Sequence, residues 1–136
     1  MKIILLIMIG LSLLQAKYIR DDAKELVLDT TTKLMWQDDT TPSTMNWSSA
    51  LNYCEALTLG GYSNWRLANF NELYFLADRT IFSPAINPVF KNVVSSFYWS
   101  SSTYVADNTL AWNVYFSNGY DYANNKTDNY YVRCVR

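Results

Sequence analysis

The stretch NWSSALNYCEALTLGGYSNWRLANFNEL, residues 46–73, predicts two helices separated by a corner. Asn46 is placed to cap the start of the first helix, and Gly60-Gly61 to end it. Asn69 followed by Glu72 has the spacing of a capping box, so a second helix is expected to begin there. Apolar residues at helical spacing form one stripe on the first helix: Trp47, Ala50, Leu51, Cys54 and Leu57.

The corner between these helices carries the triplet Trp65-Arg66-Leu67. Trp65 and Leu67 are expected to fill the core, because large apolar side chains are mostly buried. Arg66 is expected at the edge of the core, bound to a carboxylate or to helix-end carbonyl groups rather than to a ligand. A structural role is therefore predicted for Trp65, Arg66, Glu72 and Trp99.

The rest of the chain has the pattern of β-strands joined by turns. Residues 25–37 predict a hairpin, and Asn118-Gly119 is a strong signal for a second hairpin turn. We therefore expect an α+β fold, with two helices packed on a mostly antiparallel sheet with long loops. Further strands are expected at residues 98–102, 110–116, 120–122 and 130–135.

The first sixteen residues resemble a secretory signal peptide. Lys2 supplies the positive start, residues 3–14 are an apolar run too short to span a bilayer, and Ala16 ends a suitable cleavage site. An uncleaved N-terminal anchor and a buried strand are the alternatives. We expect residues 17–136 to form one domain that is exported to the periplasm, the outer surface or the medium, with no membrane span after cleavage.

Charge and cysteine content narrow the class of protein further. Removing Lys2 leaves 10 of the 11 basic residues against 12 acidic ones, a net charge of −2, so nucleic-acid binding is not expected. Cys54 and Cys134 are the two cysteines, and in an exported chain they are expected to form a disulfide. Two free buried thiols are the alternative.

Seven motifs occur in the order found in a known family. Together they cover nearly all of the expected mature chain, which is similar to the Lcl C-terminal domain family, named for a collagen-like bacterial adhesin. The motifs are LMWQ (34–37), NWSSALNYCEALTLGGYSNWRL (46–67), NEL (71–73), NPVF (87–90), YWSSSTY (98–104), AWNVYFSNG (111–119) and YYVRCVR (130–136).

This resemblance implies a C-type-lectin-like fold, related to that of formylglycine-generating enzymes, in a bacterial adhesin or envelope component. In such folds a helix cysteine pairs with a last-strand cysteine, which matches Cys54 and Cys134. The chain departs from the family where Ala68-Asn69 replaces Pro-Thr and where Asn64 replaces Asp. Since no collagen-like repeat precedes the domain in this sequence, adhesion through a triple helix is not implied.

Catalysis is not expected. The chain has no histidine, which removes Ser-His and Cys-His pairs and histidine metal sites. With both cysteines in a disulfide, no reactive cysteine is left for formylglycine-generating chemistry. The remaining carboxylate pairs are expected to be solvated surface: Asp21-Asp22, Asp38-Asp39, and Glu72 with Asp78.

A binding surface is expected near the C-terminus, because residues 101–131 hold six Tyr and six Asn, a composition resembling that of antibody paratopes. Trp112 shares a strand face with Val114 and Phe116 and is expected in the core. The alternative is that about half of the tyrosines are core as well. The candidate ligand-binding residues are Tyr104, Tyr115, Tyr120, Tyr122, Asn113 and Asn124.

Calcium is the one metal alternative, and otherwise no metal or cofactor is expected. The Trp112-Asn113 pair resembles part of a lectin calcium motif, but Val114 stands where an acidic ligand is needed. Other oxygen donors are Asp107, Asn108, Asp121, Asn124, Asn125 and Asp128, which as loop residues more often serve turns.

The sequence thus favours a non-enzymatic exported module that recognises a glycan or an envelope protein. The alternatives are a structural component of the envelope without a small-molecule ligand, and an inactive relative of formylglycine-generating enzymes. The sequence does not set the oligomeric state.

Overall fold

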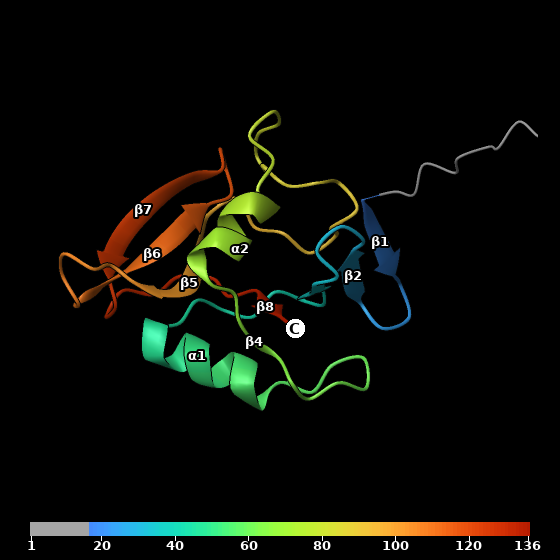
Figure 1. Ribbon diagram of the computed structural model, residues 1–136, viewed down its shortest axis with the longest axis horizontal. Coiled ribbons are helices and arrows are strands. Elements are labelled where there is room, and N and C mark those ends of the chain that lie inside the picture. The colour runs from blue at the N-terminus through green and yellow to red at the C-terminus, as the bar shows by residue number, and fades with distance from the viewer. Residues whose placement is uncertain (1–16) are drawn as a thin grey trace, which may run out of the picture.

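The computed structural model describes residues 17–136, so the expected signal segment 1–16 lies outside the described residues. In the described part, two helices and eight strands form an α+β fold, as predicted (Figure 1). The elements are β1 (Tyr18–Asp21), β2 (Leu26–Asp29), β3 (Met35–Gln37), α1 (Trp47–Ala56), β4 (Arg66–Leu67), α2 (Phe70–Leu76), β5 (Phe97–Thr103), β6 (Leu110–Tyr115), β7 (Tyr120–Asn125) and β8 (Cys134–Val135).

The strands form two antiparallel sheets, one in the order β1-β2-β3-β8-β4 and one in the order β5-β6-β7. The predicted hairpin is present as β2 and β3. The last strand is shorter than expected, because Tyr130 and Tyr131 make only isolated bridges, to Met45 and to Tyr98. The sequence did not predict β1 or β4, and β4 has only two residues, which pair with β8.

Both helices begin where their caps predict. The Asn46 side chain accepts a hydrogen bond from the Ser49 N–H at 2.9 Å, and both bonds of the capping box that joins Asn69 to Glu72 are present. However, α1 ends at Ala56, before the expected Gly60-Gly61 stop. These glycines turn the chain instead, and a Cβ on Gly60 would lie 2.6 Å from the Leu26 side chain.

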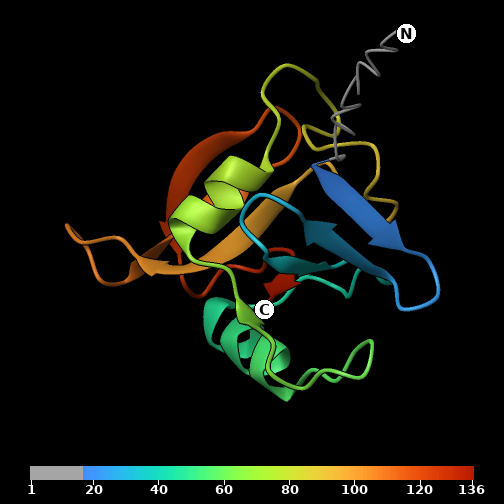
Figure 2. The ribbon, with the colours of Figure 1, turned by 45° about the vertical axis from the view of Figure 1, so that its right-hand side comes forward.

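The helices cover opposite faces of the β5-β6-β7 sheet (Figure 2). Val114 of β6 packs in one apolar cluster with Leu73 and Leu76 of α2, whereas Trp99 of β5 packs in another with Cys54 of α1. We call these the α2 cluster and the α1 cluster. Neighbouring strand residues point to opposite faces, so one sheet contributes to both clusters.

A covalent bond fixes the α1 cluster. Cys54 and Cys134 form the predicted disulfide, with an S–S distance of 2.08 Å and both residues fully buried. The segment that reaches Cys134 alternates between the two clusters, because Val132 and Cys134 lie in the α1 cluster while Tyr131 and Val135 contact the α2 cluster.

A buried carboxylate joins distant parts of the chain. Asp38 is 0% exposed and accepts hydrogen bonds from Arg20 Nε at 2.7 Å and from Arg133 Nη1 at 3.3 Å. The backbone N–H groups of Lys91 and Asn92 donate to it at 2.9 and 3.1 Å. The expectation that Asp38 belongs to a solvated carboxylate pair is therefore wrong, because its charge is balanced inside the protein.

Reduction of the disulfide is expected to lower the free energy of unfolding by about 4 kcal/mol, because the bond closes a long loop in the unfolded chain. The two cysteines are 80 residues apart. Urea unfolding with and without reductant measures the difference. Two thiols that alkylate in the native protein without reductant would contradict the disulfide.

The change Asp38→Asn is expected to lower the free energy of unfolding by about 3–5 kcal/mol, because it leaves buried arginine charge unbalanced. Urea unfolding of the variant measures this. The matched control is Asp39→Asn, since Asp39 Oδ1 accepts one bond from Gln37 Nε2, which an amide oxygen preserves. Equal losses in the two variants would show that the charge of Asp38 is not what matters.

Candidate functional site

Five of the six residues predicted for the binding surface lie on one face of the β5-β6-β7 sheet. Directly opposed residues of an antiparallel pair share a face, and Tyr115 is opposed to Tyr120 while Asn113 is opposed to Tyr122. Asn124 lies two residues beyond Tyr122 on β7 and so points to the same side. Residues that are separate in the sequence therefore meet on one surface.

Aromatic contacts join the residues of this surface across the strands. The Phe97 ring stacks on Tyr115 with centroids 4.5 Å apart and meets the edge of Tyr122 at 5.4 Å. Tyr120 is 57% exposed and Tyr122 is 41% exposed, so their rings are open to a partner. Sequence reasoning missed Phe97, although its alternation with Trp99 in the strand places it on this side. We call Phe97, Tyr115, Tyr120, Tyr122 and Asn124 the tyrosine face.

Asn113 is not on the surface, contrary to expectation. It is 0% exposed, and its Oδ1 accepts a hydrogen bond from Asn124 Nδ2 at 2.8 Å. Its own Nδ2 is buried and has no partner among the described residues. Because it is fully buried on the central strand β6, Asn113 positions Asn124 rather than contacting a ligand.

Tyr104 is separated from the other candidates. Its ring meets the edge of Trp112 at 5.1 Å, and Trp112 in turn lies 5.1 Å from the ring of Phe70 on α2. These contacts place Tyr104 on the α2 side of the sheet, away from the tyrosine face. Trp112 is only half-buried and belongs to neither apolar cluster, so its assignment to the core is wrong.

The candidate oxygen donors for calcium lie on separate segments. Asp107 and Asn108 lie between β5 and β6, whereas Asp121 and Asn125 lie on β7 and Asp128 in the turn that follows. Asp107 Oδ1 accepts bonds from the N–H and the hydroxyl of Thr109, as in a turn. Within residues 17–136, no three or more His, Cys, Asp or Glu side chains gather to hold a metal.

The residues of the structural motif differ in burial. Trp65 and Trp99 are buried in the α1 cluster. Arg66 binds Glu72 through two bonds of 2.7 Å, although its side chain is 47% exposed rather than lying at a buried edge. The Arg66 guanidinium lowers the pKa of Glu72, and the N–H of Asn69 adds to this effect while burial opposes it.

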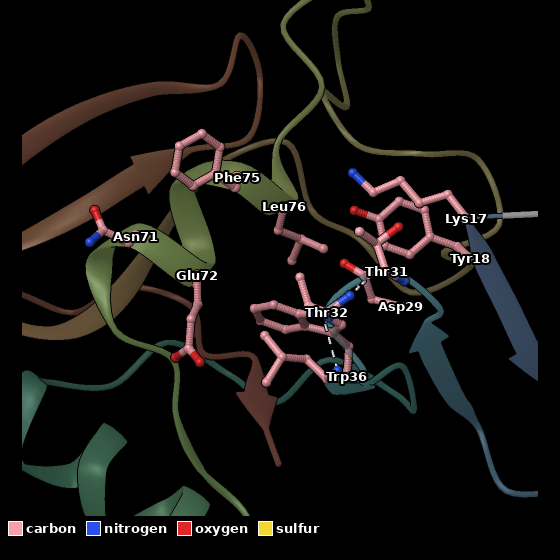
Figure 3. A pocket seen from close by; sticks show the side chains of 11 residues that line it. Lys17, Tyr18, Asp29, Thr31, Thr32, Trp36, Asn71, Glu72, Phe75 and Leu76 are labelled. Carbon is pink, nitrogen blue, oxygen red and sulfur yellow. Dashed lines mark hydrogen bonds between the residues drawn. The ribbon is translucent and has the colours of Figure 1, made fainter.

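A groove that the sequence did not predict lies between α2 and the β2-β3 turn (Figure 3). Its volume is about 270 Å³, and most of its surface is apolar. Leu76 and the exposed ring of Phe75 line it from α2, and Tyr18 and Trp36 line it from the sheet. The spacing of these residues in the sequence does not predict the groove, because the groove forms only when α2 packs beside β1.

The structure as a whole defines a disulfide-linked α+β domain, of a kind compatible with export, that presents an aromatic face and an apolar groove. The chain belongs to the Lcl C-terminal domain family, whose model matches residues 25–136. No curated protein matches the chain in sequence. Neither helix of the described part is long and apolar enough to cross a membrane.

Family membership confirms the resemblance seen in the sequence and supports an adhesin-like or binding module. The C-type-lectin-like fold stays a prediction from that resemblance.

The change Glu72→Gln is expected to lower the free energy of unfolding at neutral pH by about 1 kcal/mol, because it weakens both the helix cap and the bond to Arg66. The folded-state pKa of Glu72 is below its ordinary value, so this contribution is present above that value and is lost as pH falls through the folded pKa. Urea unfolding of the wild-type protein and the variant from neutral to acid pH measures whether their free energies of unfolding become equal at low pH.

The control for this change is Glu55→Gln, an exposed carboxylate on α1. It is expected to alter stability by less than about 0.5 kcal/mol at every pH. A constant difference between the wild-type protein and Glu72→Gln across this pH range would contradict the assigned role.

Proposed function

We propose that this domain is an exported, non-enzymatic binding module that recognises a glycan through its tyrosine face. The observation that carries the proposal is the pair of open rings of Tyr120 and Tyr122, held side by side on the edge strand β7. Aromatic rings of this kind stack on the apolar face of a sugar, while a neighbouring amide such as that of Asn124 binds hydroxyl groups.

The tyrosine face is also organised before any ligand binds. The rings of Tyr115 and Phe97 stack on each other, and Asn124 Nδ2 donates a hydrogen bond to Asn113, which holds the Asn124 amide in place. Tyrosine has few rotatable bonds, so little conformational entropy is lost on binding. These features favour recognition over catalysis, for which the chain offers no histidine and no free cysteine.

A protein of the cell envelope is the competing ligand for the same face. Exposed tyrosines are frequent in protein interfaces as well as in sugar sites. The glycan is favoured because the open part of the face consists of two rings and an amide. A protein interface of ordinary size needs about 800 Å² from each partner, with a well-packed apolar centre.

A glycan array probed with the purified protein is expected to show selective binding that Tyr122→Ala weakens about tenfold, because a central aromatic contact is lost. The control is Phe75→Ala, which removes a more exposed ring from α2, outside the tyrosine face. Parallel arrays with calcium and with a chelator test whether an ion takes part.

Two results would overturn this proposal. One is the absence of glycan binding together with capture of a single envelope protein that depends on Tyr122. The other is glycan binding that Phe75→Ala weakens as strongly as Tyr122→Ala, since the site would then lie elsewhere.

A further inference from the structure

The groove between α2 and the β2-β3 turn contains a carboxylate with no cationic partner. Asp29 is 5% exposed and lines the groove. Its Oδ1 accepts hydrogen bonds from the N–H groups of Thr31 and Thr32 at 2.9 and 3.2 Å, as in an ordinary turn. Within residues 17–136, Asp29 has no ion pair with a Lys or Arg, and its Oδ2 has no hydrogen-bond partner.

The other charges at the groove do not balance Asp29. Glu72 is neutralised by Arg66 on the far wall. Lys17 lines the groove on the same side as Asp29, beside Tyr18, but its ammonium group makes no ion pair with Asp29 and sits 5.2 Å from the centre of the Tyr18 ring. A buried carboxylate is costly unless a cation pairs with it. A cation bound next to Asp29 would therefore be stabilised by its carboxylate.

The walls around Asp29 are aromatic and apolar. Trp36 is 1% exposed and lies at the base of the groove, while Phe75 is 71% exposed and stands at its rim (Figure 3). Tyr18 closes the side opposite α2, and burial followed by the charge of Asp29 raises its pKa to about 12. Aromatic rings attract organic cations through their negative faces, most strongly where water is displaced.

From this combination we infer that the groove is a second binding site, for an alkylammonium group carried on an apolar chain. The ammonium group would pair with Asp29 Oδ2, and the chain would fill the apolar volume of about 270 Å³ between Trp36, Leu76 and Phe75. A free amine and the lysine side chain of a partner protein share this chemistry. The site is independent of glycan recognition by the tyrosine face.

The test is an NMR titration of the purified oxidised protein with n-butylammonium and, separately, with butan-1-ol. Both probes are expected to shift the side-chain signals of Trp36 and Leu76, with n-butylammonium binding at least about fivefold more tightly because only it carries the charge. Nα-acetyl-lysine amide is the third probe. If it binds as well, a lysine side chain is the source, whereas binding of n-butylammonium alone assigns the site to a free amine.

The change Asp29→Asn removes the charge but keeps an oxygen for the two turn N–H groups. It is expected to weaken n-butylammonium binding about tenfold and to leave butan-1-ol unaffected. The control is Asp107→Asn, because Asp107 caps a similar turn through Thr109 in an exposed loop. Phe75→Ala, at an exposed position, is expected to weaken n-butylammonium binding about threefold, and Tyr122→Ala to leave it unchanged.

Equal binding of butan-1-ol and n-butylammonium by the wild-type protein would overturn the proposal, as would an Asp29→Asn variant that keeps the preference for the cation. If the NMR spectrum shows that Asp29→Asn does not fold, the proposal is tested by the two probes on the wild-type protein and by Phe75→Ala. Loss of glycan binding without any change at the groove would refute only the tyrosine face.

Discussion

The pairing of Asp38 with Arg20 and Arg133 is the constraint on which the rest of the structure depends. These residues come from the start, the first third and the end of the described chain, and they meet where little water can reach. Arg133 also donates to the carbonyl oxygens of Gln37 and Asn92. A buried ion pair is stable only when every charge and donor is satisfied, so the surrounding loops have little freedom. The network thereby fixes β1 and β8 on either side of the β2-β3 hairpin.

The disulfide continues this constraint into the second sheet. It ties β8 to α1, and α1 packs on one face of β5 while α2 packs on β5 and β6 from the other side. Strand β7 lies at the edge of that sheet, and all six of its residues are half-buried or exposed. The position of β7 in the sheet order is therefore the physical reason that Tyr120 and Tyr122 stay open to a ligand.

The two surfaces differ in chemistry. The tyrosine face combines neutral rings with an amide, which suits the hydroxyl groups and apolar faces of a sugar. The groove instead has the buried carboxylate of Asp29 in a lining that also contains Tyr18, Trp36 and, at the rim, Phe75, which suits an organic cation. They lie against different elements, β7 and α2. The two proposals together therefore describe one domain with separate sites for a sugar and for an organic cation.

The sequence by itself determined the helix starts, the β2-β3 hairpin, the α+β class, the family and the disulfide. These depend on local signals, such as the capping residues Asn46 and Asn69, or on there being only two cysteines. Only the tertiary structure decided that Asn113 is buried, that Tyr104 lies apart from the tyrosine face, and that a groove forms beside Asp29. The reason is that burial and charge balance depend on which distant segments pack together. Neither the spacing of residues nor the composition predicts this packing.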